Sequence, residues 1–229
     1  MNIIENNDIQ KYKNIYENNN KKLKISNFLQ TEFAEALYRH VSLEKNWNLA
    51  SGIDANKYEK QNTPQFEKIN NLQIKNVNTA FTNNRFSYCF YRAMNNSKNI
   101  SFFEFNLRKI LNSKHVIDML NEITGLNLKG ITTLFLSKYK SGNFLSPHSD
   151  KGNGRLAFVI NLTKFWKPQY GGNLHFMNDE RTEITDTFTP EFNNFVIFNV
   201  PEGDGVPHYV SHVVQNVKVS RYAVTGWFE

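Results

Sequence analysis

The stretch Thr132–Tyr139 (TTLFLSKY) marks the point at which the sequence becomes rich in short β-forming runs. Branched and aromatic residues fill this stretch, and a turn signal, Ser141-Gly142-Asn143, follows it. Further runs of this kind, separated by glycine-rich corners, are expected at 156–162, 173–176, 195–199, 208–214 and 221–228. Many short strands with such corners predict a barrel or a double-sheet jelly roll over about residues 130–229.

Helical patterning dominates part of the preceding sequence. Phe33, Leu37 and Val41 recur at helical spacing after Thr31, which we expect to cap the helix. Two more helices are expected between Phe102 and Gly125, the glycine standing where a helix ends. The aromatic run at 86–91 (FSYCFY) predicts one strand.

These patterns predict an α+β fold with a single domain over residues 25–229. Its core is a double-stranded β-helix, a jelly-roll or cupin-like arrangement, at about 130–229, and about 25–129 supply a helical support layer. Residues 1–24 are rich in Asn, Lys and Glu with few apolar anchors, so we expect a polar N-terminal arm that is partly helical or disordered.

Composition narrows the class of protein. The 229 residues contain one cysteine, Cys89, which excludes an internal disulfide and a thiolate zinc cluster and favours a reducing, cytoplasmic location. No apolar run is long enough to span a bilayer, and residues 1–14 lack the apolar region of a secretory signal. The net charge of +6 comes from scattered lysines, which we interpret as a solvated surface.

Five polar residues carry the chemistry. His148 and Asp150 are two positions apart, so both can project from one face of a strand. His208 or His212 can complete a three-ligand metal site, and two imidazoles with one carboxylate suit Fe(II) with open positions for reactants. Arg221 supplies a planar cationic fork that matches a carboxylate.

Taken as a set, these motifs resemble the Fe(II)- and 2-oxoglutarate-dependent dioxygenases, and within them the prolyl 4-hydroxylase-like branch. The resemblance is detailed over about residues 130–229 and loose from Phe28 to Gly125. It is carried by Tyr139, Pro147–Asp150, Asn161–Thr163 with Trp166, Gly171–Leu174, His208–Ser211 and Arg221–Trp227.

The resemblance implies that His148, Asp150 and His208 bind Fe(II), and that 2-oxoglutarate and O2 are co-substrates. His212 stays the alternative third ligand, because it lies nine residues before Arg221, a spacing similar to that of animal prolyl hydroxylases. The local string Pro-His-x-Val-Ser resembles the bacterial and ribosomal-protein hydroxylases and favours His208.

The same resemblance implies four co-substrate contacts. Arg221 is expected to bind the distal carboxylate of 2-oxoglutarate, with Thr225 hydrogen-bonded to it from the same strand face. Tyr139 matches a tyrosine that contacts the co-substrate in relatives. Asn161 stands where some relatives carry another such tyrosine, and it is the fourth candidate.

The expected reaction is hydroxylation of an unactivated C–H bond, with a prolyl residue of a protein, a peptide or a free amino acid as the substrate. Asp150 favours hydroxylation over halogenation, because radical halogenases carry a small residue there. Trp227 stands where nucleic-acid demethylases usually have a second arginine, so nucleic acid is not expected. The alternatives are an oxygenase of a non-proline small molecule and a non-catalytic cupin-like binding module.

Overall fold

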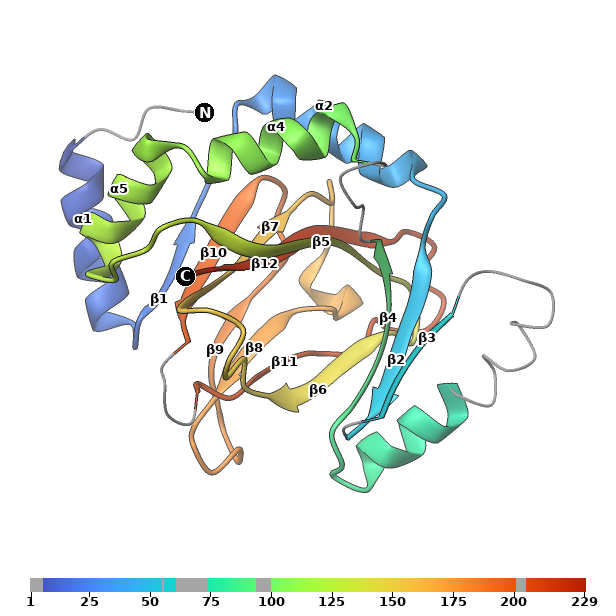
Figure 1. Cartoon of the computed structure of the whole chain (residues 1–229). Helices are drawn as coiled ribbons and strands as arrows, with labels where there is room; N and C mark the ends of the chain where they lie inside the picture. The colour runs from blue at the N-terminus through green and yellow to red at the C-terminus, as the bar shows by residue number, and fades with distance from the viewer. Residues whose placement is uncertain (1–5, 55, 61–73, 94–99, 201–204) are drawn as a thin grey trace.

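The computed structural model describes residues 6–54, 56–60, 74–93, 100–200 and 205–229. Within them four helices cover one side of a single curled sheet, and a further helix at residues 74–82 lies apart from them (Figure 1). The helices are α1 (Asn6–Asn18), α2 (Thr31–Leu43), α4 (Phe102–Leu111) and α5 (Lys114–Thr124), and residues 74–82 are also helical. None of the helices in these ranges could cross a membrane.

Twelve strands form the sheet, and their order is β1-β10-β7-β12-β5-β4-β6-β11-β8-β9, with β2 added on β4 and β3 on β2. All the neighbouring strands are antiparallel. The first six in the sequence are β1 (Lys22–Ile25), β2 (Asn48–Ile53), β3 (Asn56–Lys60), β4 (Ser87–Ala93), β5 (Ile131–Tyr139) and β6 (Phe144–His148). The others are β7 (Leu156–Asn161), β8 (Leu174–Met177), β9 (Ile184–Phe188), β10 (Asn194–Asn199), β11 (His208–Val210) and β12 (Arg221–Phe228).

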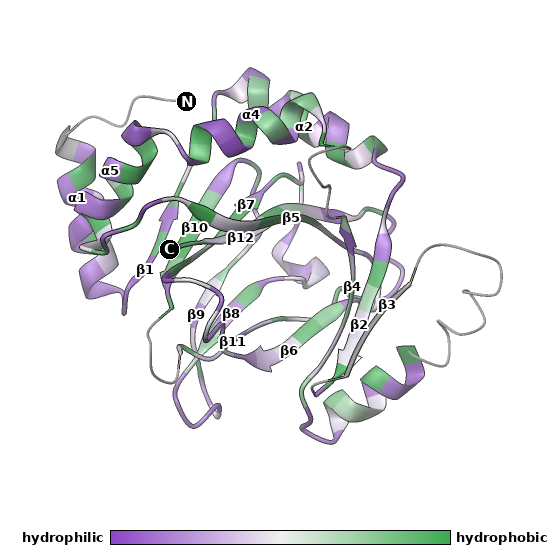
Figure 2. Ribbon diagram, viewed as in Figure 1, coloured by the Kyte–Doolittle hydropathy of each residue, from purple (hydrophilic) through white to green (hydrophobic). Residues whose placement is uncertain are grey.

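Alternation along the central strands separates two cores. On β5, Leu134 and Leu136 face outward and join the helices in one cluster, whereas Phe135 and Tyr139 face the interior of the curl. The outward cluster takes in the apolar stripes of α2, α4 and α5 (Figure 2). The fold is therefore the expected jelly roll, a double-stranded β-helix with a helical layer on one face.

An ion pair made by a buried lysine ties the two ends of the strand order together. Lys22 on β1 pairs with Asp186 on β9, although these strands are the first and last in the sheet. The Lys22 ammonium also lies 5.0 Å from the centroid of the Phe176 ring on β8. Since the lysine is only 1% exposed, it needs both partners to offset the loss of water. The curled sheet is thus closed by side chains where it has no backbone ladder.

The expected N-terminal arm is partly helical, as predicted, but it packs onto the rest of the chain. Within residues 6–25, α1 packs on α5, and β1 adds an edge strand to β10. Tyr16 and Leu23 are almost fully buried, and they anchor the segment although its overall composition is polar. The segment is part of the domain's core, and the region at 25–129 also supplies strands β2, β3 and β4 in addition to helices.

The helix boundaries test the capping predictions. Ser113 accepts a hydrogen bond from the Val116 N–H at the start of α5, and Gly125 ends that helix with a φ of 70°, as expected. The expectation for Thr31 is wrong, because Thr31 is the first helical residue of α2 and Gln30 is the N-cap, without a side-chain cap.

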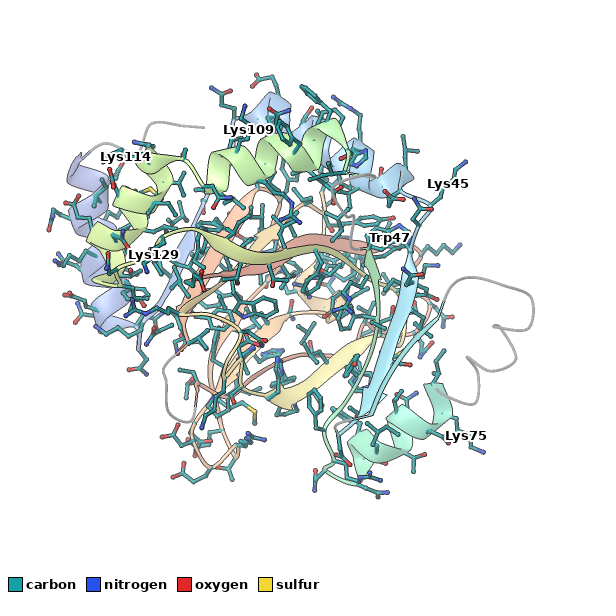
Figure 3. All side chains as sticks on the ribbon, viewed as in Figure 1. Lys45, Trp47, Lys75, Lys109, Lys114 and Lys129 are labelled. Atoms are coloured by element: carbon teal, nitrogen blue, oxygen red, sulfur yellow. The ribbon has the colours of Figure 1, made fainter. Side chains whose placement is uncertain are left out.

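Five surface lysines, Lys45, Lys75, Lys109, Lys114 and Lys129, lie on different parts of the molecule (Figure 3). Their separation is typical of lysines on a solvated surface.

We predict that Gly226→Ala destabilises the fold by roughly 1–3 kcal/mol, because β12 is fixed by β5 on one side and β7 on the other. A Cβ at this position would lie 2.6 Å from Cζ of Phe158 and closer still to the Thr133 carbonyl oxygen. Chemical denaturation measures the change. Gly130→Ala is the matched control, since its Cβ would meet only the end of the Asn112 side chain. Equal losses in the two variants would contradict the prediction.

Candidate metal and co-substrate site

The pairing of β6 with β11 brings two histidines together. His148 is the last residue of β6, His208 is the first of β11, and the two are register partners. Their ring centroids are 4.3 Å apart. Asp150 follows β6 by two residues and turns back toward both rings, so that His148, Asp150 and His208 can each offer a ligand atom within 4.8 Å of the others.

Backbone carbonyls fix the tautomer of both histidines. Nδ1 of His148 lies 3.0 Å from the Ser146 carbonyl oxygen, and Nδ1 of His208 lies 2.9 Å from that of Val206. A carbonyl oxygen only accepts, so each Nδ1 carries the proton and donates. Each Nε2 then presents a lone pair to the space shared with Asp150. Burial lowers the pKa of His208 to about 4, which keeps this imidazole neutral at pH 7.

Asp150 lies between the two imidazoles. Its Oδ1 is 3.5 Å from Nε2 of His148, and its Oδ2 is 3.6 Å from Nε2 of His208. The indole Nε1–H of Trp227 donates to Oδ2 at 3.1 Å. Burial opposes ionisation, but at the acidic pH where a carboxyl group titrates the neighbouring imidazoles attract the carboxylate, and with the hydrogen bond from Trp227 they hold the pKa of Asp150 below its usual value. The carboxylate is therefore ionised at neutral pH.

This set of donors fits a divalent transition metal. Two neutral imidazole nitrogens and one ionised carboxylate match the ligand set of a non-haem Fe(II) centre with open positions. Each imidazole is also oriented by a backbone carbonyl, as metal-ligating histidines usually are. The site therefore has both features that Fe(II) binding requires, namely suitable donor atoms and hydrogen bonds that orient the imidazole rings.

Arg221 is a buried cation in the same cavity. It begins β12, pairs in register with Tyr139 and is only 3% exposed. Its guanidinium carbon lies 5.0 Å from the centroid of the Tyr139 ring, and its Nη2 donates to Oδ1 of Asn161 at 3.4 Å. Its Nε and Nη1 are buried and have no hydrogen-bond partner among the described residues.

These unsatisfied donors fit an anionic ligand. A guanidinium buried without an anion is costly, and a carboxylate matches its fork geometry. Burial raises the pKa of Tyr139 to about 12, so its hydroxyl keeps the proton and can donate a hydrogen bond. Thr225 also lines this cavity, and its hydroxyl lies 3.4 Å from that of Ser137. One carboxylate of 2-oxoglutarate would satisfy the orphaned Arg221 donors.

One cavity of about 350 Å³ contains both groups of residues. Besides the triad and Arg221, its wall is mostly apolar and aromatic. One face of the β4 region contributes Phe86, Tyr88 and Phe90, whose neighbouring rings are 5.8 and 5.9 Å apart. Phe86 approaches the metal site, with its ring centroid 5.8 Å from that of His148. The Phe90 ring stacks on Tyr139 at 5.0 Å.

The other histidine candidates lie elsewhere. The strand expected at 208–214 ends at Val210, so His212 does not share a strand face with His208. The His212 ring instead stacks on Phe144, with ring centroids 4.1 Å apart. His175 hydrogen-bonds to the Thr187 hydroxyl at 2.8 Å and stacks on Tyr209. Neither joins the triad.

The sequence predicted His148, Asp150, His208 and Arg221 as site residues, but it did not predict the contact between Trp227 and Asp150. A usable signal was present, because Trp227 lies six residues after Arg221 and shares its strand face. The acceptor was not predictable, since Asp150 reaches the indole from outside any strand.

Comparisons with known proteins agree with this geometry. The family model described as "2OG-Fe(II) oxygenase superfamily" matches residues 134–229, which include the triad and Arg221. No curated protein matches the chain.

Solved structures show the same fold at low sequence identity. A Pseudomonas putida prolyl-4-hydroxylase is similar with a TM-score of 0.61 and 16% identity, over 96% of this chain and 98% of that one. A prolyl hydroxylase from Trichoplax adhaerens, in complex with a hypoxia inducible factor peptide fragment, has a TM-score of 0.55 and 16% identity, over 98% and 93%. The epimerase SnoN from nogalamycin biosynthesis has a TM-score of 0.57 and 10% identity, over 97% and 82%.

The matched segment carries β5 to β12, the donor set for a metal and the buried arginine. Residues 134–229 of the chain are therefore similar to the 2OG-Fe(II) oxygenase superfamily, which supports Fe(II) as the cofactor and 2-oxoglutarate and O2 as the co-substrates.

Proposed function

We propose that this protein is an Fe(II)- and 2-oxoglutarate-dependent dioxygenase that hydroxylates an unactivated C–H bond. His148, Asp150 and His208 hold the metal, and Arg221 binds the distal carboxylate of 2-oxoglutarate. The observation that carries the proposal is the presence, in one cavity, of a buried two-histidine carboxylate site and a buried arginine with orphaned donors.

When bound, iron and 2-oxoglutarate supply the activation of O2 that the amino acids cannot perform. The protein's part is to bind, orient and exclude water. Asn161 steadies the guanidinium of Arg221 through its side-chain oxygen. Tyr139 and Thr225 line the same cavity and can offer their hydroxyl groups to the co-substrate, and the apolar part of the wall would keep bulk water away from the metal.

We further propose that the group to be hydroxylated is a prolyl ring. The wall formed by Phe86, Tyr88 and Leu145 borders the His148 side of the cavity, and it suits a compact apolar ring better than a polar chain. The fold relatives named as prolyl hydroxylases, one of them bound to a peptide, support a peptide or protein substrate. A non-proline small molecule is the second candidate, because the fold relative SnoN acts in nogalamycin biosynthesis.

Replacing both His148 and Asp150 with Ala is expected to abolish binding of Fe(II), or of its redox-inert substitute Mn(II), and the release of succinate from 2-oxoglutarate. Two of the three donors are then missing. Calorimetry measures metal binding, and a coupled assay measures succinate. His175→Ala is the matched control, since this histidine lies outside the triad. If the double variant still forms succinate at the wild-type rate, the assigned site is wrong. If the wild type binds no metal, the chain is a non-catalytic cupin-like module.

Arg221→Leu is expected to weaken 2-oxoglutarate binding to the Mn(II)-loaded protein by about 2–5 kcal/mol, because the carboxylate would be buried without its cation. Titration of 2-oxoglutarate by calorimetry gives the dissociation constant. Metal affinity should change little, since Arg221 is no metal ligand in this proposal. Arg155→Leu removes a surface arginine and is expected to bind 2-oxoglutarate as the wild type does. Unchanged affinity in Arg221→Leu would assign that contact to another residue.

The substrate proposal is tested by a competition among free proline, short proline peptides, ribosomal proteins and non-proline metabolites. We expect a mass increase of one oxygen on a proline-containing compound, with 2-oxoglutarate consumed in equal amount. Mass spectrometry locates the oxygen. Turnover of a non-proline metabolite alone would replace the prolyl proposal with the small-molecule one, and the Fe(II) and 2-oxoglutarate assignment would stand.

A further inference from the structure

Trp227 is placed to act on the carboxylate of the metal site. It lies on β12 six residues after Arg221 and lines the same cavity. Its ring packs beside Phe135 of β5, with ring centroids 6.0 Å apart. Its backbone is held in register against Thr133 on β5 and Ala157 on β7. The indole is thus fixed from two strands and by a ring contact.

Trp227 donates its one side-chain hydrogen bond to the carboxylate of Asp150. Its Nε1–H is the only donor on the side chain, and it points to Oδ2 of Asp150 at 3.1 Å. The same oxygen is 3.6 Å from Nε2 of His208, and the other is 3.5 Å from Nε2 of His148. Rotation of the carboxylate about its own axis would break all three contacts.

A purely structural explanation would be that a buried indole simply needs an acceptor. Trp47 argues against it, because its Nε1 is buried and has no hydrogen-bond partner among the described residues. This fold therefore accommodates a tryptophan whose N–H is unsatisfied. The placement of the Trp227 donor on a buried, charged oxygen of the triad calls for a more specific explanation.

We propose that Trp227 is a positioning residue for the metal site: its indole N–H fixes the orientation of the Asp150 carboxylate so that the metal meets a preformed ligand set. This inference rests on the proposed function. An oxygen that accepts an N–H bond has one lone pair fewer to offer a cation, so the bond would bias which carboxylate oxygen is presented to a metal ion.

The expected effect is on metal retention. Loss of an outer hydrogen-bond partner of a metal ligand typically weakens metal affinity about 10–100-fold. For Trp227→Phe, which keeps an aromatic ring and loses the donor, we expect the dissociation constant for Mn(II) to rise by about 10-fold or more. With a chelator present, Trp227→Phe should lower the melting temperature only slightly. The decrease should be far smaller than the increase in melting temperature that Mn(II) causes in the wild type.

The experiment titrates Mn(II) into the full-length chain, following the free ion by electron paramagnetic resonance. It compares the wild type, Trp227→Phe and Trp47→Phe. The last variant makes the same chemical change at a buried tryptophan without an acceptor, so it should bind Mn(II) with wild-type affinity. A fourth protein carries 3-benzothienylalanine at position 227, in which sulfur replaces the N–H with little change in shape. It should bind Mn(II) as weakly as Trp227→Phe.

The outcomes separate the two proposals. If the wild type binds Mn(II) and the benzothienyl protein binds it equally well, the hydrogen bond has no positioning role and this inference is overturned, while the proposed metal site stands. If Trp227→Phe fails to fold, the benzothienyl protein decides alone. If the wild type binds no Mn(II), the proposed metal site is wrong, and so is the proposed role of Trp227.

Discussion

Strand β12 is the constraint on which the site depends. All eight of its residues pair with β5, and the six from Ala223 to Phe228 also pair with β7, so its register is fixed on both edges. Its outward face buries Val224 and Phe228 against the helical layer, and its inward face carries Arg221 and Trp227 into the cavity. A slip by one residue would turn the guanidinium and the indole toward the helical layer, and Val224 and Phe228 toward the cavity. The packing of the helices therefore enforces the chemistry of the interior.

The interior is costly to maintain without ligands. Arg221, Asp150 and His208 are all nearly inaccessible to water, yet the two Arg221 donors without partners among the described residues gain nothing from that burial. A fold that needed only stability would replace such groups with apolar ones. Their retention makes physical sense if binding a cation and a dicarboxylate restores the interactions lost with water. The ion pair of Lys22 and Asp186 serves a different purpose, since it is satisfied within the chain and closes the sheet.

The sequence was most informative where short-range pattern and long-range structure agree. The strand at 221–228 and the helix from Ser113 to Gly125 were predictable because alternation, capping and a C-terminal glycine all act locally. Strand β1 was not predictable, because its sequence KLKI is typical of an exposed segment. Its burial depends on the ion pair between Lys22 and Asp186 across the closed sheet. The proximity of His148 to His208 depends on the pairing of β6 with β11. Spacing along the chain allowed His212 as well, and only the end of β11 at Val210 removes that ambiguity.

The two halves of the chain contribute different parts of the cavity. Every candidate ligand of iron or 2-oxoglutarate lies within residues 134–229, the segment that matches the family model. The aromatic wall beside His148 comes instead from the β4 region, with Ala50 of β2 next to Phe90, and so from outside that segment. Reaction chemistry needs a fixed ligand set, whereas selectivity depends on the shape of the wall that the substrate touches. Substitutions in the aromatic wall of the N-terminal half are therefore expected to alter substrate selectivity more than they alter the residues that would hold the metal and its co-substrate.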